Sequence, residues 1–201
     1  MLLKGIKVGF AITGSFCTIS AVLPEIDKLA GEGADIYPII SEAVSMSDTR
    51  FGTASDLKEQ LKNKTGKEPI STIIQAEPIG PKSLLDILVV APCTGNSLSK
   101  IANAITDTSV TMACKAHMRN SKPLVIAIST NDGLGSNAKN LGMLLNMKNL
   151  YFVPFCQDNS IGKPNSLVAK MELILPAIEG ALEGKQIQPI LAQVQAIKNM
   201  Q

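Results

Sequence analysis

Hydroxyl and amide side chains gather in one short segment of the chain, Pro92–Ser97. The apolar run Ile87–Val90 precedes this segment and a helical pattern follows it, which together predict a strand, a tight polar turn and the start of a helix. Thr94, Asn96 and Ser97 would then stand with free backbone N–H groups at the carboxyl edge of a sheet, where open α/β folds bind ligands. Such donors suit a nucleotide-like or phosphorylated molecule.

Three further polar turns follow predicted strands, at Gly14–Ser15, at Ser41 and at Ser129–Gly133. Glycine lets a phosphate approach the backbone closely, and a helix N-terminus offers N–H donors to it. The first turn lacks the full G-x-G-x-x-G pattern, which argues against a dinucleotide. At each single turn an ordinary strand-to-helix connection is the alternative, but four polar turns at one sheet edge favour a shared binding site.

Three side chains are candidates for catalysis, and each has a structural alternative. Glu77, in a predicted loop before the central strand, is a candidate general base or simply an exposed carboxylate. Cys93 is a candidate nucleophile at a helix N-terminus, although a small structural residue is the favoured interpretation. His117, the single histidine, is expected on the surface near a helix C-terminus, where capping is favoured over catalysis.

The composition of the 201-residue chain argues against several classes of protein. The formal charge is +2, aromatic residues make up 3% and there is no basic run, so nucleic-acid binding is disfavoured. No apolar segment approaches the roughly 20 residues of a membrane-spanning helix, and Met1–Ile6 leads into a strand pattern instead of a signal peptide, so we expect a soluble cytoplasmic protein. Four scattered cysteines and one histidine argue against a metal site.

The order of elements predicts an α/β fold with a parallel sheet, as one domain over residues 1–201. The tail from about residue 184 is expected to be a helix that docks elsewhere or on a neighbouring subunit. Pro24 should kink the first helix or mark its start. We expect strands at residues 6–13, 34–40, 72–76, 84–91, 122–129 and 151–155. We expect helices at residues 16–30, 55–66, 97–104, 109–119, 137–147 and 165–182.

The segment Pro92–Ser97, with Lys100–Asn103 and Asp107 after it, resembles the Pro-Ala-Ser-Ala-Asn-Thr signature of the homo-oligomeric flavin-containing Cys decarboxylase superfamily. This resemblance implies a Rossmann-like three-layer fold, FMN held between subunits, and trimers or multiples of trimers. It also implies which residues bind the cofactor: Gly14, Ser15, Ser41, Pro92, Thr94, Asn96, Ser97 and Ser129.

The chain departs from the decarboxylase pattern at three places, one of which is the signature itself, where Cys93 and Gly95 replace the usual residues. Decarboxylases of the superfamily carry a histidine before the central strand, where this chain has Glu77. Their Pro-Ala-Met-Asn loop is replaced by Ile128–Asn131, so only Asn131 carries over, as a substrate-facing amide and, with Glu77, a candidate catalytic residue. Cysteine decarboxylation is therefore disfavoured, and it would need His117 to reach the site.

Three later segments are similar to one group within the superfamily, the B subunits of a two-subunit synthase: Ser129–Ala138, Lys148–Phe155 and Lys163–Val168. That similarity implies oxidation of a dihydrodipicolinate-type precursor to dipicolinate (pyridine-2,6-dicarboxylate) in the mother cell of a sporulating bacterium. An A subunit that uses NADP is the implied partner. Lys100 and Arg119 are candidates for attracting the two carboxylates, with structural salt bridges as the alternative. A non-catalytic scaffold or substrate-binding partner of the A subunit is the second hypothesis.

Overall fold

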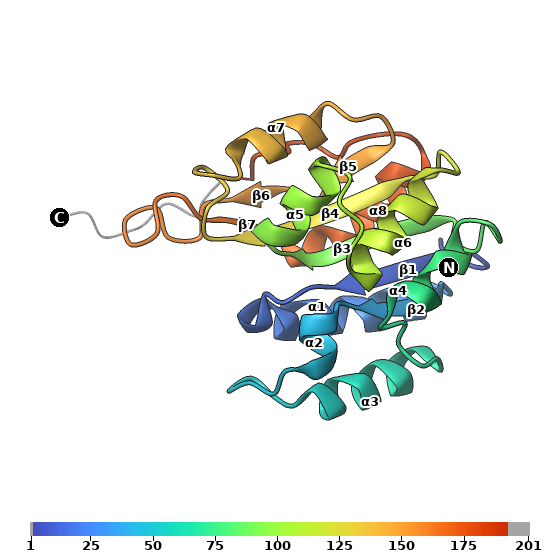
Figure 1. Ribbon diagram of the computed structural model, residues 1–201. Helices are drawn as coiled ribbons and strands as arrows, with labels where there is room; N and C mark the ends of the chain where they lie inside the picture. Colours follow the sequence, from blue (N-terminus) through green and yellow to red (C-terminus); the bar gives the residue numbers. More distant parts are fainter. Residues whose placement is uncertain (1, 193–201) are drawn as a thin grey trace.

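The computed structural model describes residues 2–192, and Figure 1 shows its central sheet between layers of helices. Five strands run parallel in the order β2-β1-β3-β4-β5: β1 (Lys7–Ile12), β2 (Asp35–Ile40), β3 (Ile87–Cys93), β4 (Leu124–Thr130) and β5 (Leu150–Phe152). β3 and the first six residues of β4 are buried throughout. Runs such as Ile87–Val90 are apolar on both faces because helices cover the parallel sheet from both sides.

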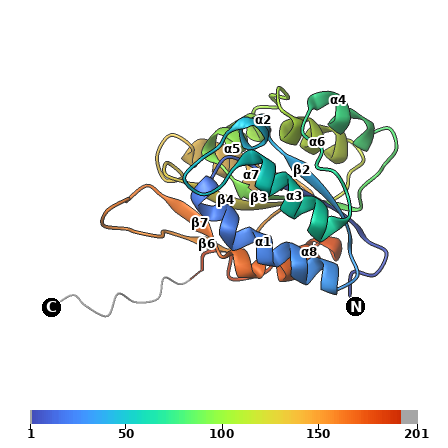
Figure 2. The same cartoon turned by 90° about the horizontal axis from the view of Figure 1, so that it is seen from below.

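The helices form two layers around this sheet. α1 (Phe16–Gly31) and α8 (Ile174–Leu182) pack together on one face, and α5 (Gly95–Ala102), α6 (Ser109–Met118) and α7 (Ala138–Leu145) lie on the other (Figure 2). α2 (Glu42–Met46) and α3 (Ala54–Thr65) stand beside β2 and α1. None of the described helices is both long and apolar enough to cross a bilayer.

The first helix begins where expected. α1 starts at Phe16 and continues past Pro24, so this proline does not mark its start. α3 is capped by Thr53, whose side chain accepts a hydrogen bond from the Asp56 N–H, and it ends at Gly66 in the left-handed conformation that glycine adopts readily.

The prediction of a strand at residues 72–76 is wrong. This segment forms a short helix, α4 (Ile73–Ala76), followed by the 3-10 turn η1 (Glu77–Ile79). Thr72 and Gln75 make a reciprocal capping box, in which the Thr72 hydroxyl accepts from the Gln75 N–H and the Gln75 side chain accepts from the Thr72 N–H. This cap outweighs the strand preference of the β-branched residues.

The helix expected at residues 165–182 is correct only from Ile174 onward. Its first part forms β7 (Leu167–Ala169), which pairs antiparallel with β4 and with β6 (Phe155–Cys156), and the 3-10 turn η2 (Met171–Leu173) follows. β5 pairs only with the first half of β4, so the edge beyond Ile126 is left open and β7 fills it.

The tail from residue 184 is not helical in the part that the structure describes. Gln186 bonds to both the N–H and the carbonyl of Phe152, each at 2.7 Å, and Leu191 forms a bridge with Phe155. These contacts hold the segment against the β5–β6 region. The rest of the predicted tail helix, residues 193–201, lies outside the described residues.

Candidate functional site

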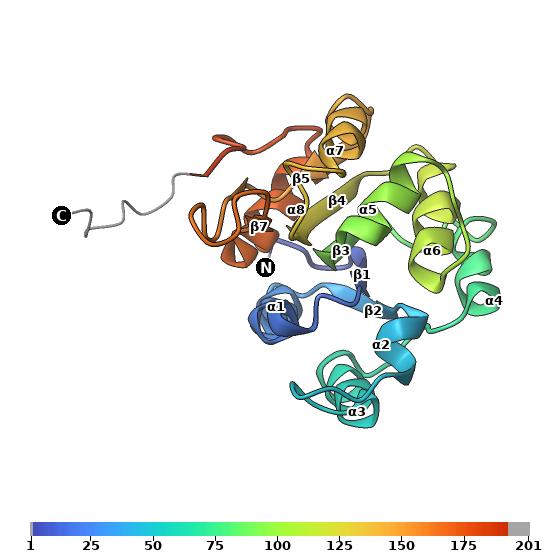
Figure 3. The same ribbon diagram turned by 60° about the vertical axis from the view of Figure 1, so that its left-hand side comes forward.

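The carboxyl ends of β1 and β3 form the topological switch point of the sheet, because the chain leaves β1 toward β2 and leaves β3 toward β4 on the other side. Open α/β folds bind ligands in the crevice that such divergence creates. Figure 3 turns this edge toward the viewer and shows α1, α2 and α5 starting around it. The polar turns predicted from the sequence lie here.

Thr13 ties the two turns at the switch point together. Its side chain is 1% exposed; Oγ1 donates to the Pro92 carbonyl at 2.7 Å and accepts from the Thr94 N–H at 2.9 Å. Thr94 in turn caps α5, accepting from the Ser97 N–H at 3.2 Å and donating to the Ser97 hydroxyl at 3.0 Å. Pro92, Thr94 and Ser97 therefore shape the crevice through bonds within the chain, and the peptide bond before Pro92 is cis.

Three hydroxyl groups meet at the first turn of α1. Ser15 Oγ and Thr18 Oγ1 each lie 2.9 Å from Ser129 Oγ, and they are 3.1 Å apart. Among the described residues, no backbone acceptor meets the N–H groups of Phe16 and Cys17, the first two of this helix. We call Ser15, Thr18 and Ser129 the hydroxyl cluster; together with these amides it forms a set of neutral donors at the positive end of a helix.

The remaining predicted binding residues flank this edge. Ser41 caps α2, accepting from the Val44 N–H at 3.4 Å. Gly14, in the turn after β1, faces the start of α2 after β2, since a Cβ there would sit 3.9 Å from the Cβ of Ala43. Asn96 and Asn131 are exposed and make no hydrogen bond through their side chains within the described chain. They are thus available to a ligand, and their roles stay predictions.

Gly95, the first residue of α5, is packed against a polar network that sequence patterns did not single out. An added Cβ would overlap the Thr130 hydroxyl and would lie 2.6 Å from Asp132 Oδ1 and 2.7 Å from Asn137 Nδ2. The Asp132 carboxylate accepts from the Thr130 hydroxyl at 2.5 Å and from Asn137 at 2.8 Å. Asn140 continues the network by donating to Asn137 at 2.8 Å. The only signal in the sequence is the glycine where the family signature has alanine.

Glu77 is not brought to this edge. It is exposed and lies in η1, directly after α4, which Figure 1 places at the end of the molecule where β1 begins. Three residues later, the Gly80 carbonyl accepts from Asn120 at 3.0 Å, just beyond the C-terminus of α6. The candidate general base therefore stands apart from the hydroxyl cluster and Asn131.

His117 is buried, contrary to the expected surface position. His117 lies in α6 and is 1% exposed. Its Nε2 lies 2.9 Å from the Pro123 carbonyl oxygen, just before β4 begins. Burial lowers the pKa of His117, with the Pro123 hydrogen bond opposing this effect. Its place at the amino end of β4 removes the geometry that cysteine decarboxylation through His117 would need.

This buried imidazole predicts a pH-dependent stability. Because the folded-state pKa lies below the unfolded value of about 6.5, unfolding takes up a proton, and stability falls as the pH drops below about 6.5. The expected result is a decline in the free energy of unfolding between about pH 6.5 and 5 that His117→Gln flattens. Urea titrations at several pH values measure it. Equal slopes in both proteins would contradict the assignment.

Cys93 is buried completely at the end of β3, as the structural interpretation predicted. Burial raises the pKa of its thiol far above the ordinary range, and the neighbouring Cys114 raises it further. Complete burial therefore favours the structural role and argues against a nucleophilic one.

The two cations suggested for substrate carboxylates do not converge. Lys100 forms an ion pair with Asp107 at 2.9 Å. Arg119 is exposed at the C-terminus of α6, beside Gly80 and away from the carboxyl edge. The structural salt bridge is therefore correct for Lys100.

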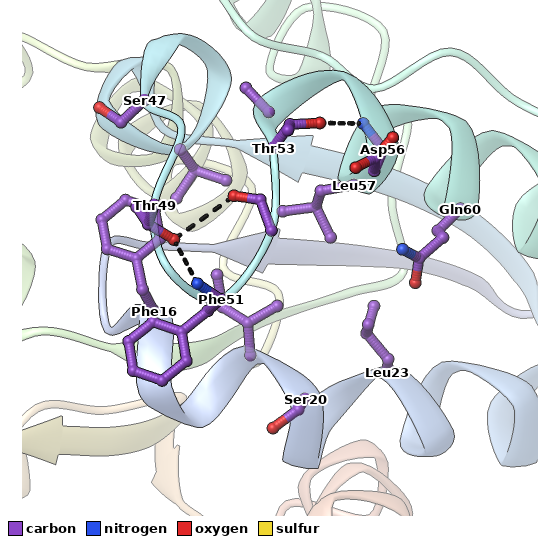
Figure 4. A pocket seen from close by; sticks show the side chains of 14 residues that line it. Phe16, Ser20, Leu23, Ser47, Thr49, Phe51, Thr53, Asp56, Leu57 and Gln60 are labelled. Carbon is purple, nitrogen blue, oxygen red and sulfur yellow. Dashed lines mark hydrogen bonds between the residues drawn. The ribbon is translucent and has the colours of Figure 1, made fainter.

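A cavity of about 280 Å³ opens between α1, α2 and α3, next to the turns after β1 and β2. Figure 4 shows Phe16 and Phe51 at one end of it, with Thr53, Asp56 and Gln60 toward the other. Ligand pockets start at roughly 300 Å³. At about 280 Å³ this cavity is at the small end of that range, too small for a dinucleotide.

Comparisons with a family model, with curated proteins and with solved structures all point to the same family. The family model described as Flavoprotein matches residues 2–178. The B subunit of dipicolinate synthase from Bacillus subtilis (strain 168) is 50% identical over 191 residues, covering 95% of this chain and 96% of the relative. The crystal structure of the dipicolinate synthase B subunit from Bacillus halodurans is 48% identical with a TM-score of 0.89, covering 96% of this chain and 99% of that one.

A more distant structure shares the fold. The FMN-dependent cysteine decarboxylase SpaF is 22% identical with a TM-score of 0.64, covering 91% of this chain and 98% of its own. The α/β fold and the family resemblance predicted from the motifs are both confirmed.

Proposed function

The chain belongs to the Flavoprotein family, and on this premise we propose that it is the B subunit of a dipicolinate synthase that binds FMN at the switch point. Identity of 50% over nearly the whole chain supports this assignment. The observation that carries the cofactor assignment is the hydroxyl cluster at the first turn of α1. Formation of dipicolinate from a dihydrodipicolinate-type precursor, in the mother-cell cytoplasm during sporulation, is part of the proposal.

The donors at the switch point fit the phosphate end of FMN. Ser15, Thr18 and Ser129 offer hydroxyls that can rotate toward an anion, and the amides of Phe16 and Cys17 add unpaired donors at the helix N-terminus. FMN, when bound, supplies a two-electron acceptor, and aromatisation of the substrate ring favours the oxidation.

The chain's own residues would bind and orient. Ser41 and the cap of α5 by Thr94 fix the two flanking turns, while Asn96 and Asn131 present free amides at the same edge. The A subunit would supply NADP. A homo-oligomer, as a trimer or a multiple of trimers, is the assembly we propose for this chain.

One observation favours the second candidate, a non-catalytic scaffold or substrate-binding partner of the A subunit. The three hydroxyls bond to one another, and the start of α5 at Gly95 is covered on one side by Thr130 and Asp132. A chain that kept the flavin fold without the flavin could close its site in this way.

Absorbance spectra and gel filtration of the purified protein with FMN separate these two functions. We expect FMN to co-elute stoichiometrically, and Ser15→Ala to weaken its binding roughly tenfold, because a hydrogen bond to a charged group is lost. Ser55→Ala is the matched control, since Ser55 is exposed on α3 and forms no hydrogen bond through its side chain within the described chain.

Absence of FMN binding would support the second candidate function. If the wild-type protein retains no FMN even at high concentration, yet raises the turnover of the A subunit, the scaffold is the correct function. Gel filtration in the same experiment reports the oligomeric state.

A further inference from the structure

A tight turn at the rim of the cavity presents a cation and an aromatic ring. The Thr49 N–H donates to the Gly52 carbonyl at 3.0 Å and the Gly52 N–H donates to the Thr49 carbonyl at 3.2 Å, so Arg50 and Phe51 form the tip. The Thr49 hydroxyl accepts from the Phe51 N–H at 3.1 Å. Gly52 has φ +140°, a conformation that favours glycine. Residues 49–52, which we call the Arg50 turn, are thus held in place by their own backbone.

The guanidinium at this tip lies over an aromatic ring and is not used in an ion pair within the described residues. Its central carbon lies 4.8 Å from the centroid of the Phe51 ring, and within the described part of the chain no carboxylate pairs with it. Phe51 is 54% exposed, so the ring contributes little to the core. Arginine presents a planar fork of donors that matches a carboxylate, and it stacks on aromatic faces.

The cavity below the Arg50 turn has the shape and lining for a flat, partly apolar ring. Phe16 and Phe51 lie at one end, with the apolar side chains of Leu23 and Leu57 in the wall (Figure 4). Its volume of about 280 Å³ limits the occupant to a small molecule.

The charges around the cavity favour an anion at the end where the two phenylalanines lie. The acidic group in the lining, Asp56, is near the other end, beside Thr53 (Figure 4). The Asp48 carboxylate is held at the start of α3, where it accepts a hydrogen bond from the Ala54 N–H at 2.9 Å. Arg50 does not line the cavity itself, but its guanidinium lies over the ring of Phe51, which does, so a positive charge stands at the rim beside this end.

We propose that the Arg50 turn and this cavity form the binding site for a planar aromatic dicarboxylate. Arg50 binds one carboxylate through its guanidinium, and Phe51 and Phe16 contact the ring. The chemical class of this ligand rests on the proposed function, whereas the site itself rests on the turn, the cavity and the unpaired cation. Arg50 is thus a residue for substrate specificity, separate from the hydroxyl cluster proposed for FMN.

Calorimetric titration of the full-length protein with pyridine-2,6-dicarboxylate tests this proposal. We expect wild-type protein to bind, and Arg50→Gln to weaken binding roughly tenfold or more, because a charge-assisted hydrogen bond is removed. Arg50→Lys should recover part of the affinity, since it keeps the charge without the planar fork. Arg119→Gln is the matched control, because Arg119 is the only other arginine and lies at the opposite end of the strands.

FMN retention and elution volume, measured on the same samples, distinguish the possible outcomes. FMN retention should be equal in wild type and Arg50→Gln, and so should the elution volume. Absence of binding to wild type, equal affinity in Arg50→Gln, or a change of oligomeric state in place of affinity would each overturn the proposal. Loss of FMN from every variant, with dicarboxylate binding still dependent on Arg50, would instead reject the flavin function and leave this site standing.

Discussion

Gly95→Ala will lower the free energy of unfolding by about 2 kcal/mol, a typical cost of forcing atoms into a filled space. The added methyl would overlap the Thr130 hydroxyl and press on Asp132 and Asn137. Their side chains are short and tied to one another by hydrogen bonds, so moving one breaks its bonds to the others. Urea unfolding followed by circular dichroism measures the loss.

Gly142→Ala is the matched control for this substitution. Gly142 lies in α7, is exposed, and an added Cβ would meet nothing within 4 Å. Alanine there should stabilise the protein by about 0.5–1 kcal/mol through helix propensity. If both variants shifted in the same direction and by similar amounts, the network around Gly95 would not be the cause.

The parallel sheet could be predicted because its strands are apolar on both faces and end in polar turns. The run expected at residues 6–13 became β1 (Lys7–Ile12), and the strand expected at 84–91 became β3 (Ile87–Cys93), with boundaries shifted by a few residues. The flavin-type motif at Pro92–Ser97 identified the family because it is longer and more specific than a single glycine-rich turn.

The predictions that were wrong concern elements whose structure depends on contacts that a local sequence pattern does not contain. β7 exists because the second half of β4 is left open by the short β5, a fact about three segments that are distant in sequence. The β-branched residues of Thr72–Ala76 predicted a strand. In the structure Ile74 is 84% exposed, and the reciprocal cap stabilises a helix instead.

The sequence predicted which polar turns share one edge of the sheet, but it did not predict the hydrogen bonds within them. Ser15 and Ser129 were both candidates, but their direct contact across 114 positions could not be seen in the sequence. Thr18 carried a readable signal, since a hydroxyl three residues after Ser15 lies on the same side of a helix. Thr13 carried none, because a threonine at the end of a strand looks like any other β-branched strand residue.

That hidden role makes Thr13 the position of the second large effect. Thr13→Val keeps the shape of the side chain but removes the acceptor of the Thr94 N–H and the donor to Pro92. A buried N–H without a partner costs about 1–3 kcal/mol, so we expect the free energy of unfolding to fall by about 2 kcal/mol. FMN binding should weaken as well, because the turns after β1 and β3 lose the side-chain hydrogen bonds that join them.

Thr13→Ser separates the hydroxyl from the rest of the side chain. Serine keeps both hydrogen bonds and loses one buried methyl, so it should retain FMN like the wild type and lose about 1 kcal/mol at most. Urea unfolding and FMN co-elution, measured on both variants, test the two parts separately. If Thr13→Ser were as damaging to FMN binding as Thr13→Val, the methyl contact would set the geometry of the switch point, and the hydroxyl bridge would not.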